Sequence, residues 1–252
     1  MKKLICLMCL LITLTLSACK NTEITISPIS EISETETSET DTTSSIDAKS
    51  SSYQISDFNC VYQNPELPTG CEITAMDMVL QYYGFDIDKV TLAKEYMPTI
   101  SYGSYRNDEN VVDKSDMNNY FIGDPETVMG YIAGTGAVQT AANNYLEETD
   151  SDLRAYDITG VSLSEIYEYV ADDTPVVVWV TIGMVDRTEI KYYYVDYTNY
   201  IEWTYNDHGA VLIGYDDSTV TIADPIDGIV EYDKEQFESV FESRGNMAVI
   251  LS

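Results

Sequence analysis

The stretch TGCEITAMDMVLQYYG, residues 69–84, decides how this chain folds. Its apolar side chains recur at helical spacing, and Gly84 is a typical residue to follow a last helical turn. The pattern predicts a helix over residues 71–83 that begins at Cys71. A thiol in the first turn of a helix faces the positive end of the helix dipole, which favours the thiolate, the form that attacks carbonyl carbons. Glu72 is expected to stabilise the helix start rather than to act as a catalytic acid.

Outward from this helix, patterns typical of helices come first and patterns typical of strands come later. Shorter helices, the last one capped by Ser162, are predicted at residues 89–96, 125–132, 137–146 and 163–171. Segments rich in β-branched and aromatic residues predict strands at residues 176–182, 208–215, 219–223, 229–232 and 246–251, with a helix at residues 234–242. The tyrosine-rich residues 191–205 predict one or two further strands or a long loop. This order favours an α+β fold, with N-terminal helices packed on a C-terminal antiparallel sheet.

The single histidine of the chain, His208, begins the apolar run HGAVLIGY at residues 208–215. A lone histidine more often lies on the surface or in a satisfied core position than in a catalytic site. A polar residue at the end of a buried strand, however, typically faces a cleft. His208 is therefore the candidate base for a nucleophile at Cys71.

Asp224 is the candidate for the acid that orients this histidine. A hairpin of residues 208–214 and 218–224 places His208 directly opposite Asp224 on one apolar face. Cross-strand neighbours lie about 4.5 to 5.5 Å apart at Cβ, so the carboxylate would reach the imidazole. With Cys71, the two residues would form a nucleophile, a base and an orienting acid. The alternative for Asp224 is a plain turn residue, which is also expected of other aspartates nearby: Asp207 beside the hairpin, and Asp216, Asp217 and Asp227 in turns.

Acyl transfer also needs hydrogen-bond donors aimed at the developing oxyanion. The backbone N–H of Cys71 at the helix start is one candidate. The side-chain amide of Gln63, in the segment QNPELPTGC at residues 63–71, is the candidate for the second. Asn64 competes with it, and a loop glutamine without a catalytic role is the other alternative.

Cys60 and Cys71 are the cysteines left for structure or chemistry once the N-terminal segment is set aside. Outside the cell, where disulfides persist, the two could simply be paired. A disulfide would leave no nucleophile, and the domain would then be a binding module. No metal or other cofactor is implied, because one histidine and one reactive thiol make no ligand cluster.

The N-terminus has the three zones of a secretory signal: Lys2 and Lys3, an apolar run at residues 4–16, and small residues before Cys19. The run is too short to span a membrane. Its end resembles the lipobox of bacterial lipoproteins, which implies a signal peptide at residues 1–19 and lipidation of Cys19. An ordinary cleaved signal is the alternative.

Residues 20–55 are dominated by Ser, Thr, Glu and Asp, which predicts a disordered tether. Residues 56–252 then suit one folded domain. The formal net charge of −30 excludes the basic surface of a nucleic-acid binder. We therefore expect a domain on the extracellular face of the bacterial membrane, attached to that membrane through lipid on Cys19.

The region from about residue 57 to residue 252 resembles the C39-like branch of the papain-like cysteine peptidases. The resemblance is most specific at residues 63–84, and the later strand segments and the dipeptide Asp224-Pro225 are similar in order and character. It implies a papain-like α+β fold. It also implies roles for four residues: nucleophile Cys71, base His208, orienting acid Asp224 and oxyanion donor Gln63.

Together these features predict a cell-surface lipoprotein whose domain cleaves a peptide or amide bond through an acyl-enzyme. Two alternatives stay open. One is a catalytically inactive surface binding module with the same fold. The other is a cell-wall amidase or an acyltransferase that uses the same triad.

Overall fold

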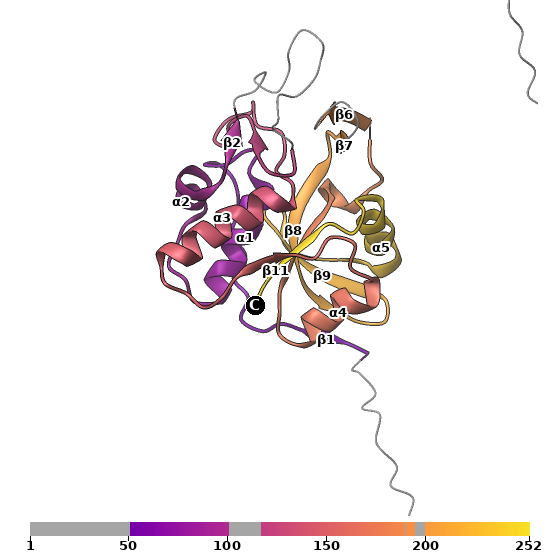
Figure 1. Cartoon of the computed structure of the whole chain (residues 1–252). Helices are drawn as coiled ribbons and strands as arrows, with labels where there is room; N and C mark the ends of the chain where they lie inside the picture. Colours follow the sequence, from indigo (N-terminus) through magenta and orange to yellow (C-terminus); the bar gives the residue numbers. More distant parts are fainter. Residues whose placement is uncertain (1–50, 101–116, 189, 195–199) are drawn as a thin grey trace, which may run out of the picture. The chain divides into compact units, whose positions relative to one another are not determined.

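The computed structural model describes residues 51–100, 117–188, 190–194 and 200–252 (Figure 1). The predicted signal peptide, the predicted lipidation site Cys19 and residues 20–50 of the predicted tether lie outside the described residues. Within the described ranges, no helix combines the length and the apolar character needed to cross a bilayer.

An antiparallel sheet of seven strands forms the centre of the domain, because several apolar segments bury both faces. Six strands follow the order β10-β9-β8-β5-β11-β4, and β1 pairs with the end of β8. The strands are β1 (Tyr53–Gln54), β4 (Ala155–Asp157), β5 (Val176–Thr181), β8 (Asp207–Tyr215), β9 (Thr219–Asp224), β10 (Gly228–Asp233) and β11 (Ala248–Leu251). β5 and β8 are buried along their whole length, which explains their continuous apolar sequences.

Helices pack against this sheet, and Figure 1 shows α1, α2 and α3 grouped on one side with α4 and α5 on the other. The elements are α1 (Cys71–Tyr82), α2 (Lys89–Thr91), the π-helix η1 (Leu92–Tyr96), α3 (Thr135–Glu148), α4 (Leu163–Ala171), the 3-10 turn η2 (Ile182–Met184) and α5 (Lys234–Ser243). α1 contacts β8 and β5, while α5 contacts β5, β9 and β10. Ser162 caps α4 in a capping box with Glu165, as its sequence predicts.

Two small sheets complete the described part. β2 (Thr99–Ile100) and β3 (Phe121–Ile122) pair in parallel, and β6 (Ile190–Tyr194) and β7 (Tyr200–Thr204) pair as antiparallel strands. The tyrosine-rich segment therefore contains two strands rather than a long loop.

The helix predicted at residues 125–132 is wrong. Asp124 begins a turn instead: its carboxylate accepts a hydrogen bond from the N–H of Glu126 at 3.0 Å, and its carbonyl accepts one from Thr127 at 3.1 Å. Aspartate side chains that bond to nearby N–H groups offer the backbone an alternative to a helix.

The predicted register of the β8–β9 hairpin is also wrong, although His208 and Asp224 still meet. At the turn, Tyr215 pairs with Val220, a register that would put His208 and Asp224 on opposite faces. A bulge at Ile213 adds one residue to β8 and shifts the pairing by one position. The two side chains thereby return to the same face as diagonal rather than direct neighbours.

β1 supports this bulge and extends the domain toward the N-terminus. The N–H of Ile55 donates a hydrogen bond to the carbonyl of Ile213 at 2.8 Å. Because β1 begins at Tyr53, the folded part starts before the boundary expected at residue 56.

Candidate active site

Cys71 is the first residue of α1 and lies where this helix meets β8. Gly209 makes the close approach possible, because a Cβ at this position would lie 2.7 Å from the Cα of Glu72. The backbone N–H of Gly209 also interacts with the Cys71 sulfur. Any side chain at position 209 would push the helix away from the strand, and so would move Cys71 away from His208.

His208 is held by Asp224, as predicted. The imidazole Nε2 lies 2.9 Å from Oδ1 of Asp224, and the two residues are 1% and 3% exposed. The same oxygen accepts hydrogen bonds from the N–H groups of Ile226 at 2.7 Å and Asp227 at 3.3 Å. Burial raises the pKa of Asp224, but the hydrogen bond and charge of His208 and the two N–H groups outweigh it, and the pKa is lowered overall. Asp224 is therefore a carboxylate at neutral pH.

The other ring nitrogen of His208, Nδ1, takes no part in the contact with Asp224. It is buried and has no hydrogen-bond partner in the part of the chain that the structure describes. His208 and Cys71 line one pocket of about 260 Å³. If Nε2 carries the proton that binds the Asp224 carboxylate, Nδ1 has a free lone pair and can accept a proton.

Gln63 lies in the same pocket, whereas its competitor Asn64 is exposed. The backbone N–H of Gln63 donates to the carbonyl of Pro225 at 2.8 Å, next to Asp224. Its side-chain Nε2 donates to the carbonyl of Pro68 at 2.9 Å. An amide nitrogen carries two hydrogens, so one remains for a ligand in the pocket.

The expectation that the helix start favours a thiolate is wrong for the resting site. Burial, followed by the charge of Glu72, raises the pKa of the Cys71 thiol well above its ordinary value. The N–H groups of Gly209 and Glu72 lower it only in part. The thiol therefore stays protonated at neutral pH until a base takes its proton.

Residues 55–249 match the model of the Peptidase_C39 like family. The chain belongs to this family. The uncharacterized protein YvpB of Bacillus subtilis (strain 168) is 30% identical over 190 residues, which are 74% of this chain and 70% of YvpB. The crystal structure of a candidate C39-like peptidase from Bacillus anthracis is 30% identical, covers 80% of this chain and 97% of its own, and has a TM-score of 0.69. The predicted α+β fold of the papain-like cysteine peptidases is thereby confirmed.

Cys60 does not pair with Cys71 in this C39-like domain. Both cysteines are free thiols, and the Cys60 S–H donates to the backbone carbonyl of Asp224 at 3.5 Å. Burial and then the charge of Asp224 raise the pKa of Cys60 to about 11. Unlike Cys71, Cys60 does not line the pocket that His208 lines.

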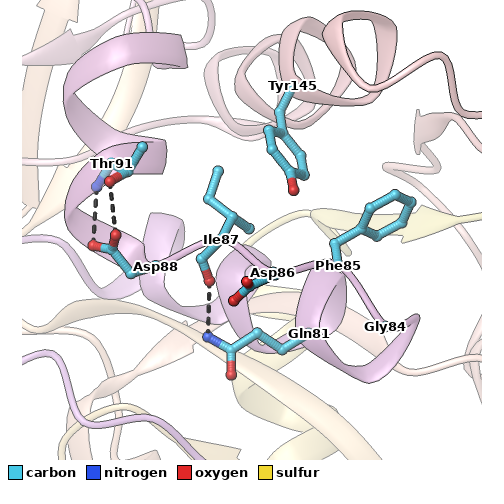
Figure 2. A pocket seen from close by; sticks show the side chains of 8 residues that line it. All are labelled: Gln81, Gly84, Phe85, Asp86, Ile87, Asp88, Thr91 and Tyr145. Atoms are coloured by element: carbon cyan, nitrogen blue, oxygen red, sulfur yellow. Dashed lines mark hydrogen bonds between the residues drawn. The ribbon is translucent and has the colours of Figure 1, made fainter.

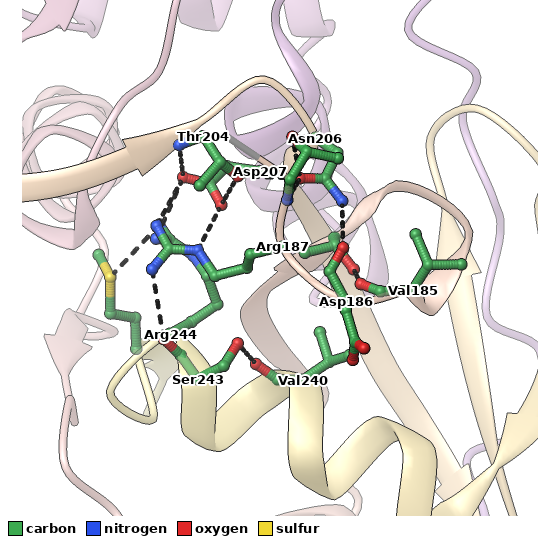
Figure 3. Close-up of polar contacts among 12 residues, drawn as sticks. Val185, Asp186, Arg187, Thr204, Asn206, Asp207, Val240, Ser243 and Arg244 are labelled. Atoms are coloured by element: carbon green, nitrogen blue, oxygen red, sulfur yellow. Dashed lines mark hydrogen bonds and ion pairs between the residues drawn. The ribbon is translucent and has the colours of Figure 1, made fainter. Parts of the chain in front are cut away.

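Asp207 is not a simple hairpin flank but the centre of a buried ion cluster (Figure 3). Its carboxylate lies 3.2 Å from Nε of Arg187 and 3.1 Å from Nη1 of Arg244. Thr204 donates to it from its N–H at 2.8 Å and from its hydroxyl at 2.9 Å. This cluster could not be predicted from local sequence patterns, because both arginines come from segments distant from β8.

Glu72 lies in the first turn of α1, as predicted, but it is buried. Only 1% of it is exposed, and its carboxyl lies beside Cys71. The sequence pattern does not reveal that Glu72 is buried, because an acid after a helix start is ordinarily a surface residue.

A second pocket, of about 650 Å³, is formed by the end of α1, the start of α2 and Tyr145 of α3 (Figure 2). Its polar groups are used within the fold: Gln81 donates to the carbonyl of Ile87 at 3.2 Å, and Asp88 caps α2. None of the predicted site residues lines this pocket, so the candidate site of the C39-like domain is the smaller one.

Proposed function

We propose that this protein is a cysteine hydrolase that cleaves a peptide or amide bond through an acyl-enzyme on Cys71. One observation carries the proposal: His208 binds Asp224 through one nitrogen and leaves the other unpartnered, among the described residues, in the pocket that Cys71 lines. A nucleophile, a base and an orienting acid are the groups that acyl transfer requires. Membership of the Peptidase_C39 like family supports the same class of reaction.

The first half of the reaction forms a thioester. The Cys71 sulfur attacks the carbonyl carbon, and its proton passes to Nδ1 of His208. Asp224 stabilises the imidazolium through Nε2. The proton then passes from Nδ1 to the leaving amine as the C–N bond breaks, and the acyl group stays on sulfur.

The second half releases the acyl group as a carboxylic acid. Water attacks the thioester, and Nδ1 of His208 takes the proton of the water. The C–S bond breaks, and the sulfur takes the proton back from Nδ1 of His208, which restores the resting thiol and the neutral imidazole.

Two donors are placed to stabilise the oxyanion in both halves. The backbone N–H of Cys71 belongs to the first turn of α1, where N–H groups have no acceptor within the helix. Gln63 offers the second hydrogen of its side-chain amide. Donors of this kind, fixed before the reaction, act on the charge that develops in the transition state.

The rim of the pocket favours substrates with apolar side chains. Val128, Ile182 and Tyr205 line the pocket, and they are 82%, 42% and 64% exposed. Large apolar side chains that remain in contact with water around a pocket are typical of a surface that binds a ligand.

Digestion of a proteome-derived peptide library in ¹⁸O-labelled water tests the proposal. Wild-type protein and Cys60→Ala should produce peptides whose new C-termini carry ¹⁸O, whereas Cys71→Ala should produce none. Cys60→Ala is the matched control because it also removes a partly buried thiol. Equal cleavage by the wild type and Cys71→Ala would contradict the proposal, as would the absence of new termini in every digest.

We also propose that a lipid on Cys19 anchors the domain at the extracellular face of the bacterial membrane. The signal and the lipobox-like end of residues 1–19 support this location. Cys19→Ala should move the protein from the membrane fraction to the medium. An unchanged distribution would rule out this anchor.

A further inference from the structure

Glu72 is a buried carboxyl beside the proposed nucleophile, and the mechanism above does not use it. Its Oε1 accepts a hydrogen bond from the N–H of Ala133 at 3.4 Å. Its Oε2 is buried and has no hydrogen-bond partner within the described ranges. The N–H of Glu72 itself and the side chain of Cys71 also interact with this carboxyl, but a negative charge so fully removed from water remains costly.

The surroundings hold this carboxyl in place. Gly209 of β8 packs so closely that a Cβ there would lie 2.8 Å from the Cγ of Glu72. Ala133, the hydrogen-bond donor, is itself fixed, because Nε1 of Trp179 in β5 donates to its carbonyl at 2.9 Å. Glu72 therefore cannot turn toward solvent without moving β8 or the segment before α3.

The charges around Glu72 explain why its protonation matters. Cys71 on the same helix and His208 on β8 are the titratable groups that act on it, and Asp224 on β9 lies behind His208. Asp224 already compensates one positive charge on His208. A thiolate at Cys71 together with a carboxylate at Glu72 would put two further negative charges into one buried site, and like charges so close cannot both form easily.

We propose that a negative charge on Glu72 opposes the ionisation of Cys71, so that Glu72 is a positioning residue that couples the reactivity of the nucleophile to pH. The inference rests on the proposed function, because it concerns the same thiol. Glu72 acts only through Cys71 and takes no part in proton transfer to the substrate.

The pH range of this coupling lies near neutrality. Burial raises the pKa of Glu72 to about 7, against the lowering effects of nearby N–H groups and of His208. Below this pKa the carboxyl is neutral and does not oppose a thiolate. Above it the carboxylate forms and raises the pKa of Cys71, which limits the gain in thiolate that higher pH would otherwise bring.

Alkylation of Cys71 by iodoacetamide, followed by peptide mapping, tests this coupling in the wild type and in Glu72→Gln. Glutamine keeps the shape of the side chain but cannot ionise. Labelling rates of the two proteins should agree within about twofold at about pH 5.5. At about pH 8.5 the variant should react about threefold to tenfold faster. Lowering the pKa of the Cys71 thiol by about one unit raises its thiolate fraction about tenfold, but a less basic thiolate is also a weaker nucleophile, which offsets part of the gain.

Two controls separate the coupling from a loosened structure. Asp77→Asn replaces another buried carboxyl of α1, whose pKa burial also raises to about 7, and it should leave the pH profile of Cys71 unchanged. Cys60, mapped in the same digests, should react equally in the wild type and Glu72→Gln. If the ratio of the Cys71 labelling rate in Glu72→Gln to that in the wild type is the same at every pH, the inference is overturned.

A measurement on the unsubstituted residue keeps the inference testable if Glu72→Gln does not fold. In protein with ¹³C-labelled glutamate, one carboxyl signal should titrate with a midpoint near 7 and should shift in Cys71→Ala. If every glutamate titrates in the ordinary range, the inference fails. If labelling of Cys71 does not depend on His208, the proposed function fails instead, so the two failures are distinguishable.

Discussion

Asp207 and Asp224 are two buried carboxylates near His208 that have different partners. Asp224 binds a single imidazole, at 2.9 Å, in the pocket that Cys71 lines. Asp207 binds the two guanidinium groups of Arg187 and Arg244. An imidazole has one ring nitrogen that can accept a hydrogen bond as well as one that donates, whereas a guanidinium has only donors.

The geometry of the strands explains the difference. Asp207 directly precedes His208 in β8, and adjacent residues of a strand point to opposite faces. Asp224 comes from β9 and reaches the face of His208 because of the bulge at Ile213. Proximity in the sequence is therefore a poor guide to which acid orients the histidine.

His208→Ala should have the largest effect, because it removes the one group that makes the Asp224 pair reactive. On a peptide that the library identifies, kcat/KM should fall by about 10³-fold, the usual contribution of a general base. Steady-state kinetics measures this. A variant that keeps more than a tenth of the wild-type activity would mean that another group takes the proton.

Asp207→Asn should affect stability rather than chemistry. The substitution leaves the buried guanidinium of Arg244 and the partly buried one of Arg187 without this carboxylate, and losing one partner of a buried ion pair lowers the free energy of unfolding by about 3 to 5 kcal/mol. Urea denaturation measures the loss. Alkylation of Cys71 in the folded fraction should stay within about threefold of the wild type, and a larger fall would show that Asp207 also acts on His208.

Asp224→Asn should affect the rate of the reaction more than the stability of the fold. An amide cannot stabilise the imidazolium, so kcat/KM should fall by about 100-fold, the lower end of the usual contribution of general acid–base catalysis. The free energy of unfolding should fall by only about 1 to 2 kcal/mol, since the amide oxygen still accepts the hydrogen bonds of Ile226 and Asp227. Unchanged kinetics would return Asp224 to the role of a plain turn residue.

The smallest effect is the pH dependence that Asp224 gives to stability. Its folded pKa is lowered, so its stabilising contribution is fully present above the unfolded pKa and is lost as the pH falls through the folded pKa. Near neutrality, the free energy of unfolding of the wild type should exceed that of Asp224→Asn by about 1 kcal/mol. Urea titrations at decreasing pH should show this difference disappear, and a constant difference would exclude ionisation as its cause.

The helix at Cys71 and most of the strands could be predicted because their signals are local. The apolar spacing after Cys71, the cap at Ser162 and the apolar run after His208 each report on a few consecutive residues. The pairing of His208 with Asp224 also follows from period-two alternation, provided that the register is not shifted by an odd number of residues. The register was wrong because the strands pair as far as Tyr215 and Val220, so that the turn lies further along the chain than predicted, and because the bulge at Ile213 shifts the pairing by one position.

The remaining features depend on contacts between distant segments. Arg187 and Arg244 lie 20 and 37 residues from Asp207 and reach it only through the fold. Glu72 has the sequence position of an ordinary first-turn acid, and only the packing of Gly209 against it reveals its burial. The raised pKa of Cys71 has the same origin, because it comes from that burial and from Glu72.

The most direct test of the Cys71–His208 pair is the rate at which iodoacetamide labels Cys71 at about pH 6.5, in the wild type and in His208→Ala. Because burial keeps the isolated thiol protonated, the wild type should react at least about tenfold faster than the variant. Equal rates in the two proteins would mean that His208 does not take the proton of Cys71, and the hydrolase proposal would then be wrong.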